Sequence, residues 1–179
     1  MCIRDRPWGL SAQPTEFEPA PVPAPVLETA PEGAPGFMLY SSGSTGRPKG
    51  VPHASRSLLG PAAPWGTEIL GVKADDVLFS ASKMSFAYGL MSSLTLPLFF
   101  GATAVLFPGK PGPYELFECI ARHRPSLFFC VPTLYGMMLR AFEPGTPGCD
   151  LSSLRLCYSA GEALPASQCR EWQAQTGVE

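Results

Sequence analysis

Charge is scarce in this sequence and is evenly divided between the two signs. Charged residues make up 16% of the chain, with 13 Lys and Arg against 15 Asp and Glu, and the net charge is −2. The sequence contains no long run of like charges. A nucleic-acid platform and a polybasic membrane binder both depend on clustered positive charge. We therefore expect neither a nucleic acid nor a membrane surface as a partner.

The six cysteines lack the spacing of a metal or redox motif. No two of them form a Cys-x-x-Cys pair, which removes the zinc-ribbon and thioredoxin-type interpretations. Cys119, Cys130 and Cys157 lie in apolar runs, where a free thiol behaves as a small hydrophobe. The first residues do not resemble a secretory signal. We expect reduced thiols and a reducing compartment, the cytoplasm.

The longest uncharged stretch lacks the character of a membrane span. It extends from Lys83 to Lys110 and is long enough on paper to cross a bilayer. Pro97 and Gly101 interrupt it, and residues 103–107 have the composition of a strand. A buried helix followed by a buried strand explains this stretch, and no membrane segment is expected.

Proline marks off the beginning of the chain. Residues 11–35 hold seven prolines and one glycine. Proline breaks helices and has no backbone N–H to donate between strands, so neither a helix nor a strand is expected here. We expect residues 1–35 to be a proline-rich linker or ragged N-terminal end, and ordered structure to begin at Phe37. Residues 36–179 then form one domain.

Strands and helices alternate through residues 36–179. Strands are predicted at 37–40, 50–53, 77–79, 103–107, 128–131 and 154–158. Helices are predicted from Ser55 to a break at Gly60, Pro61 and Pro64, and over 86–99, 114–122, 133–142 and 166–175. Apolar strands between helices predict an α/β fold with an at least partly parallel sheet.

The most specific motif is the loop at residues 40–50, Tyr-Ser-Ser-Gly-Ser-Thr-Gly-Arg-Pro-Lys-Gly. Its glycines permit positive φ, its hydroxyls donate to anions, and Lys49 adds a full positive charge. A Walker A loop places Lys directly after Gly at the start of a helix, whereas Pro48 precedes Lys49 here. We therefore predict a phosphate-binding loop between two strands, with a plain surface hairpin as the alternative.

This loop resembles the signature of the adenylate-forming (ANL) superfamily of AMP-dependent synthetases and ligases. Two further segments agree with the family in order and spacing, Phe86-Ala87-Tyr88-Gly89-Leu90 and the sequence Ser-Ala-Gly-Glu-Ala-Leu-Pro at 159–165. With Val-Pro-Thr-Leu-Tyr at 131–135, the chain is most similar to the benzoate–CoA ligase branch. The resemblance covers about residues 34–179 and implies part of the large N-terminal domain of such an enzyme.

The resemblance also implies roles for individual residues. The ATP phosphates would be held by Ser41, Ser42, Gly43, Ser44, Thr45, Gly46 and Lys49, with Lys49 as the catalytic cation. The adenine and acyl wall would be Ser159, Ala160, Gly161, Glu162 and Ala163, and the acyl pocket Phe86, Ala87, Tyr88 and Gly89. A small carboxylate is the implied substrate, ATP, Mg²⁺ and CoA are the implied cofactors, and no metal ligand is expected within this chain. For Tyr88, a half-buried core aromatic is the alternative, because Phe86 and Leu90 flank it at core-like spacing.

The chain departs from the family pattern at two points. Ser55 stands where many relatives carry the second residue of a His-x-His pair, and we expect it to cap a helix instead. His53 could face the site, but we expect a lone histidine beside Pro52 to be structural. The family's acidic-Thr-Glu motif would lie beyond Glu179, so we expect an internal fragment, truncated at both ends and inactive alone, of undefined oligomeric state.

Three other functions stay open. An amino-acid adenylation domain of a peptide synthetase needs an acidic pocket residue, which 86–90 does not offer. A non-catalytic nucleotide-binding module would keep the fold without the chemistry. A cysteine hydrolase needs a thiolate with a histidine base, and nothing ties His53 or His123 to a cysteine.

Overall fold

The computed structural model describes residues 31, 33–41, 46–143 and 148–178. The chain divides into two units, residues 1–31 and residues 32–179, and all the elements below belong to the second. The predicted linker falls largely outside the described residues, so the domain division stays a prediction. The first strand begins at Pro35, two residues before the expected onset of order at Phe37.

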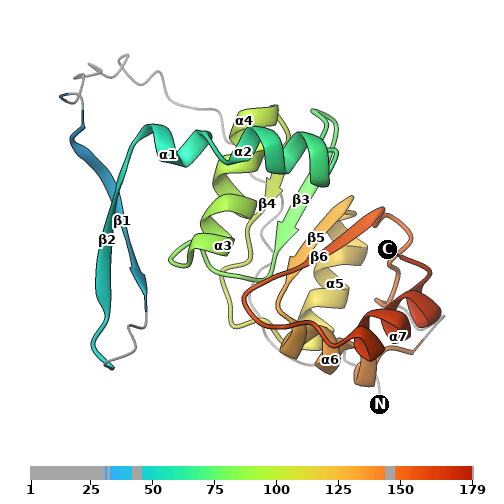
Figure 1. Ribbon diagram of the computed structural model, residues 1–179. Coiled ribbons are helices and arrows are strands. Elements are labelled where there is room, and N and C mark those ends of the chain that lie inside the picture. The colour runs from blue at the N-terminus through green and yellow to red at the C-terminus, as the bar shows by residue number, and fades with distance from the viewer. Residues whose placement is uncertain (1–30, 32, 42–45, 144–147, 179) are drawn as a thin grey trace. The chain divides into compact units, whose positions relative to one another are not determined.

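The first two strands form an antiparallel hairpin, β1 (Pro35–Ser41) and β2 (Lys49–Ala54), as predicted (Figure 1). Ser41 pairs with Lys49 at the end where the strands meet the loop. At the other end, the rings of Phe37 and His53 stack with centroids 4.9 Å apart. This stacking gives His53 the structural role expected of it.

The other four strands form a parallel sheet. They are β3 (Val77–Ser80), β4 (Thr103–Val105), β5 (Leu127–Cys130) and β6 (Leu156–Ser159), in the order β4-β3-β5-β6. Every neighbouring pair is parallel, which confirms the prediction from the apolar strands. The order reverses beside β3, because β4 lies on one side of it and β5 on the other. In sheets of this kind ligands bind beyond the carboxyl ends of the strands, at the point of reversal.

Helices cover both faces of the sheet (Figure 1). Side chains from α2 (Ala62–Pro64) and α4 (Leu96–Phe100) pack with Leu78, Leu127 and Phe129. The opposite face carries Phe79, Phe128 and Cys130. Against it pack α5 (Pro113–His123), α6 (Pro132–Ala141) and α7 (Ala166–Thr176). Burial of these alternating side chains on two faces is the main source of stability.

The first helical stretch breaks at Gly60 and Pro61 as predicted, because one helix ends at Leu59 and the next begins at Ala62, but it does not break at Pro64. After α1 (Arg56–Leu59) the backbone angles of Gly60 and Pro61 stay right-handed helical, and the π-helical turn η1 (Trp65–Ile69) extends α2 beyond Pro64. Pro64 stands in the first turn of α2, where the missing N–H has no helical partner to lose. Ser55 occupies the N-cap position of α1 as expected, but its side chain makes no capping hydrogen bond.

The helix predicted over 86–99 consists of three pieces. These are α3 (Ala87–Leu90), the π-helical turn η2 (Met91–Thr95) and α4, which contains Pro97. The wider turn accommodates the proline ring, which would otherwise collide with the carbonyl four residues earlier. In η2 the Ser92 hydroxyl donates to the carbonyl of Tyr88 at 2.7 Å. No helix in the described residues has both the length and the apolar character needed to cross a bilayer.

An ion pair ties the strands together at their amino ends. Arg155, just before β6, donates to both carboxylate oxygens of Asp76, just before β3, at 3.0 and 2.6 Å. The hydroxyl of Ser126, just before β5, donates to the same carboxylate at 2.7 Å. Burial would raise the pKa of Asp76, but these hydrogen bonds outweigh it and hold the pKa below its usual value. We call these three residues the amino-edge clamp.

Candidate functional site

The segments that follow β3 and β6 meet at the carboxyl edge of the sheet. The hydroxyl of Tyr88 donates to the carbonyl oxygen of Tyr158 at 2.7 Å, across 70 residues of sequence. Residues 86–89, assigned to the acyl pocket, and residues 159–163, assigned to the adenine and acyl wall, are thus brought together. This edge is where parallel α/β sheets bind ligands.

Tyr88 is half-buried and belongs to the core as well as to this junction. Its ring lies 6.3 Å from that of Phe129 and 6.4 Å from that of Tyr158, centroid to centroid. Burial raises the pKa of Tyr88, so the phenol stays protonated and donates its hydrogen bond. Because Tyr158 accepts that bond, the ring rather than the hydroxyl is what Tyr88 can offer to a ligand.

The other residues of 86–89 divide between surface and interior. Phe86 is 66% exposed, and Ala87 is exposed beside it. Gly89 is buried, and a Cβ at this position would collide with the backbone of Lys83 and Ser82. Glycine therefore lets α3 lie directly against the turn that leaves β3.

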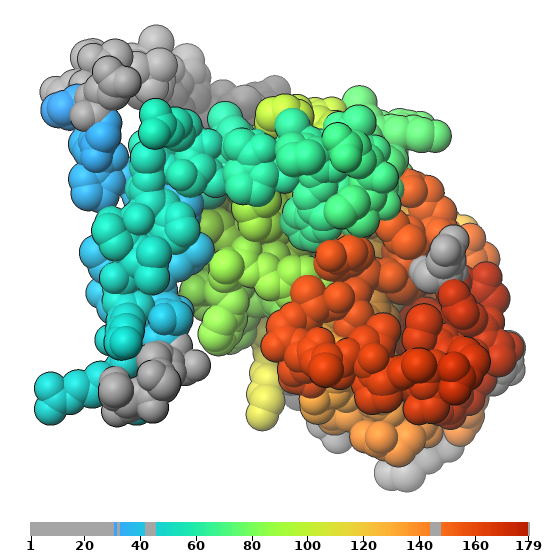
Figure 2. Space-filling view, in the orientation of Figure 1, coloured from blue at the N-terminus to red at the C-terminus, as the bar shows by residue number. Residues whose placement is uncertain are grey.

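The segment from Ser159 to Pro165, which we call the 159–165 loop, joins β6 to α7. In the space-filling view this part of the chain, coloured orange to red, lies on the visible surface (Figure 2). Gly161 adopts a φ of +88°, a left-handed conformation that favours glycine. Gly161, Glu162 and Ala163 are exposed, so their backbone is accessible to a ligand.

Two side-chain contacts fasten this part of the chain to the start of α6. The carboxylate of Glu162 accepts hydrogen bonds from Thr133, at 2.6 Å from the hydroxyl and 3.2 Å from the backbone N–H. The amide of Gln168 donates to the carbonyl of Pro132 at 2.6 Å. Sequence analysis assigned no role to Thr133 or Gln168, because partners 29 and 36 residues apart leave no local spacing signal.

The structure describes the predicted phosphate loop only at its two ends. Ser42, Gly43, Ser44 and Thr45 lie outside the described residues. Gly46 has a φ of +77°, the positive value expected of a glycine in such a loop. Ser41 and Lys49 face each other across the hairpin, and both are exposed.

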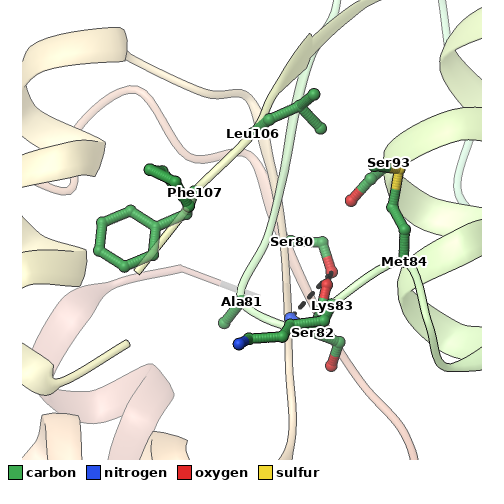
Figure 3. Close-up of a pocket in the computed structure, with 9 residues that line it drawn as sticks. Ser80, Ala81, Ser82, Lys83, Met84, Ser93, Leu106 and Phe107 are labelled. Carbon is green, nitrogen blue, oxygen red and sulfur yellow. Dashed lines mark hydrogen bonds between the residues drawn. The ribbon is translucent and has the colours of Figure 1, made fainter. Parts of the chain in front are cut away.

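A cavity of about 190 Å³ opens where β3 and β4 end, and sequence analysis did not predict it (Figure 3). The Ser80 hydroxyl in its wall accepts a hydrogen bond from the N–H of Ser82 at 3.2 Å. Phe107 and Ser93 lie on opposite sides of this turn. The lining residues are Ser80, Ala81, Ser82, Lys83, Met84, Ser93, Leu106, Phe107 and Pro108.

The three cysteines of the apolar runs are unsuited to nucleophilic catalysis. Burial raises the pKa of Cys119 to about 11 and that of Cys157 to about 12, and it also raises the pKa of Cys130. A catalytic thiolate requires a lowered pKa. All five cysteines in the described residues are free, as expected. The cysteine-hydrolase alternative therefore has no geometric support.

Potential metal ligands do not gather in the described part of the chain. No group of three His, Cys, Asp or Glu side chains suited to holding an ion occurs there.

Comparison with known proteins gives concordant matches. The family described as AMP-binding enzyme matches residues 3–179. A benzoate–CoA ligase of Thauera aromatica is 50% identical over 143 residues, which are 80% of this chain and 27% of that protein. The chain spans about a quarter of the length of the curated relatives that it matches.

Solved structures agree with this result. The crystal structure of an anthranilate–CoA ligase in complex with anthranoyl-AMP superposes with a TM-score of 0.72 at 40% identity, over 79% of this chain and 27% of that one. A benzoate–CoA ligase from Burkholderia xenovorans gives 0.71 at 40% identity, over 82% and 28%.

Proposed function

The chain belongs to the AMP-binding enzyme family, and from this premise we propose that it is part of the N-terminal domain of an acid–CoA ligase acting on aromatic acids. In the first half-reaction a carboxylate oxygen attacks the α-phosphorus of ATP, and pyrophosphate leaves. In the second, the CoA thiol attacks the acyl carbon, loses its proton, and AMP leaves. The observation that carries the proposal is the junction of residues 86–89 with the 159–165 loop, in a chain 50% identical to a benzoate–CoA ligase.

In this proposal the phosphate loop neutralises charge rather than forming a covalent bond. Lys49 lies at the loop end of the hairpin, exposed and opposite Ser41. With residues 42–45 it would hold the triphosphate while negative charge shifts onto the leaving pyrophosphate. Positioning and charge neutralisation are the main sources of rate enhancement in such transfers. Mg²⁺ would add to this neutralisation, and we assign it no ligand among the described residues.

The proposed substrate class follows from the aromatic character of the junction. Tyr88, Phe129 and Tyr158 stand close together there, and residues 84–93 include no charged side chain. The α-ammonium group of an amino acid would be left unpaired against such a surface, at a cost of several kcal/mol. An aromatic acid therefore fits better than an amino acid, which disfavours the peptide-synthetase alternative. The cytoplasm remains the predicted compartment.

A chimeric enzyme tests the proposal. The 143 matched residues of this chain would replace their counterparts in the Thauera aromatica ligase, which restores the rest of that protein around them. We expect benzoate-dependent formation of AMP and benzoyl-CoA, with acetate and amino acids turned over more slowly. Lys49→Ala should lower kcat/KM by about 10- to 100-fold, the range for one charged contact to the transition state.

Circular dichroism and thermal unfolding establish that the chimera is folded. A folded chimera without benzoate-dependent AMP formation would favour the non-catalytic module, and faster turnover of an amino acid would favour the peptide-synthetase alternative. The 179-residue chain alone should form no detectable benzoyl-CoA. Catalytic groups that act together are strongly non-additive, so a site that holds only some of them loses nearly all of its activity.

A further inference from the structure

We propose that Thr133 and Gln168 are positioning residues that hold the 159–165 loop against the start of α6 and so set the affinity for the nucleotide. This inference rests on the proposed function, because it assumes that the loop contacts ATP. Thr133 and Gln168 are not expected to touch either substrate. They act through the backbone of the loop.

Hydrogen bonds attach the loop and the start of α7 to the first turn of α6 at two points. Glu162 is bound within the loop, and Gln168 is bound in the first turn of α7, just after it. Both partners, Thr133 and Pro132, belong to the first turn of α6. Since β6 holds the other end of the loop in the sheet, the exposed residues 161–163 lie between fixed points.

The attachment through Glu162 is electrostatically favourable. The N–H of Thr133 is one of the first in α6, and such groups have no partner within their own helix. Val131, the capping residue of α6, supplies no side-chain hydrogen bond. A carboxylate at a helix N-terminus meets both the free N–H groups and the positive end of the helix dipole. The 2.6 Å bond from the Thr133 hydroxyl adds a charge-assisted contact.

This attachment determines what the loop presents to a ligand. With its carboxylate turned toward α6, Glu162 offers its backbone rather than its charge to a bound molecule. Gly161 holds the chain in its left-handed turn immediately before. A loop fixed in this way loses little conformational freedom on binding, so more of the contact energy appears as affinity.

Residues 86–89 on the acyl side and residues 161–163 of the loop are anchored by different side chains, although 159–163 is assigned to both the adenine and the acyl wall. The acyl side is fixed mainly by the 2.7 Å bond from Tyr88 to Tyr158, which lies before the loop and involves neither Thr133 nor Pro132. The Tyr135 hydroxyl, farther along α6, donates to the same carbonyl at 3.4 Å. Loosening the loop at Thr133 should therefore weaken nucleotide binding without moving the acyl side. KM for ATP should therefore rise while KM for benzoate stays constant. A general loss of folding would not produce this difference between the two constants.

The kinetic test uses the chimera. Thr133→Val removes the hydroxyl donor while keeping shape and N–H, and we expect KM for ATP to rise about five- to tenfold. The values of kcat and of KM for benzoate should stay within about twofold. Thr133→Ser should restore the normal KM for ATP, and Gln168→Met should raise it in the same direction. Thr103→Val is the matched control, because Thr103 is an exposed threonine at the amino end of β4.

Hydrogen exchange in the 179-residue chain gives a readout that needs no activity. Thr133→Val should speed exchange at the amides of residues 160–164 and leave β3 and β5 unchanged, with Thr133→Ser matching the original chain. Unchanged exchange in the valine variant would refute the fastening while leaving the proposed function intact. Faster exchange with an unchanged KM for ATP, or an equal effect on both KM values, would refute the positioning role. A folded but inactive chimera would instead refute the proposed function, and the nucleotide role of the loop with it.

Discussion

The two ends of the parallel sheet are built from opposite kinds of interaction. At the amino edge, Arg155 joins three strands through a buried carboxylate, and its guanidinium also donates to the carbonyls of Leu70 and Gly71. At the carboxyl edge, the described contacts are hydrogen bonds from side chains to backbone carbonyls and one exposed carboxylate at a helix start. The amino edge is therefore specialised for cohesion, and the carboxyl edge keeps accessible backbone for a ligand.

This division allows stability and binding to be tested separately. A change in the amino-edge clamp should weaken folding and leave KM values alone. A change at the carboxyl edge should do the reverse. The four predictions below test this contrast, beginning with the largest effect.

The first prediction concerns the shared carboxylate of the clamp. Asp76→Asn should lower the free energy of unfolding by about 2 kcal/mol, because it weakens the charge-assisted hydrogen bonds that Arg155 and Ser126 donate to a buried carboxylate. Urea denaturation at neutral pH measures the change. Asp75→Asn is the control, because Asp75 is exposed beside it. An equal loss in both variants would show that the clamp contributes nothing specific.

The second prediction concerns the pH dependence of that loss. The folded pKa of Asp76 lies below its unfolded value, which is about 3.9 for an ordinary aspartate. Its contribution is therefore fully present above that pH and is lost as the pH falls through the lowered folded value. The stability gap between the original chain and Asp76→Asn should close on acidification. A gap that stays constant down to acid unfolding would contradict the assigned pKa direction.

The third prediction moves to the carboxyl edge. Tyr88→Phe should cost only about 1 kcal/mol of stability, since one neutral hydrogen bond is lost and the Tyr158 carbonyl still has the Tyr135 hydroxyl at 3.4 Å. In the chimera KM for benzoate should rise while KM for ATP stays constant, the reverse of the pattern for Thr133→Val. Tyr114→Phe, at a residue 58% exposed, controls for loss of a phenol. A rise in both KM values would show that the two sides of the site are not separable.

The smallest stability effect is expected at Phe86. Because this side chain is 66% exposed, Phe86→Ala should change the free energy of unfolding by no more than about 0.5 kcal/mol. If Phe86 contacts the acid, KM for benzoate should nevertheless rise. Urea denaturation measures the stability change of this variant, and steady-state kinetics measure its KM for benzoate. A clear loss of stability would place Phe86 in the folding core instead.

The sequence allowed much of the fold to be predicted because the decisive signals are local. The apolar run 128–131 and the helical spacing in 114–122 predicted a buried strand and a helix, and the structure has them at Leu127–Cys130 and Pro113–His123. The break predicted at Pro64 is the exception, because this proline stands in the first turn of its helix, where its missing N–H costs no hydrogen bond. Proline forbids a regular helix interior, but it does not forbid a helix that first widens by one residue, as η2 does before Pro97.

The candidate site was predictable only where a resemblance supplied it. Residues 86–89 and 159–163 were named from family motifs, and the structure brings these segments together. The pairs Thr133–Glu162 and Asp76–Arg155 were missed. Each joins residues that are separated by tens of positions and have no shared periodicity, so only the folded chain shows them to be partners.

The π-helical turn η2 has a consequence for how this chain should be aligned with other sequences. A π turn holds one residue more than the α-helical turn it replaces, and each residue of an α-helix turns the chain by about 100°. Deleting one residue within Met91–Thr95 would make the helix regular, but it would rotate Tyr88 away from its present direction relative to Leu96. A relative with a one-residue gap at this place should therefore differ in the side chains it directs toward the junction, even where every motif is retained.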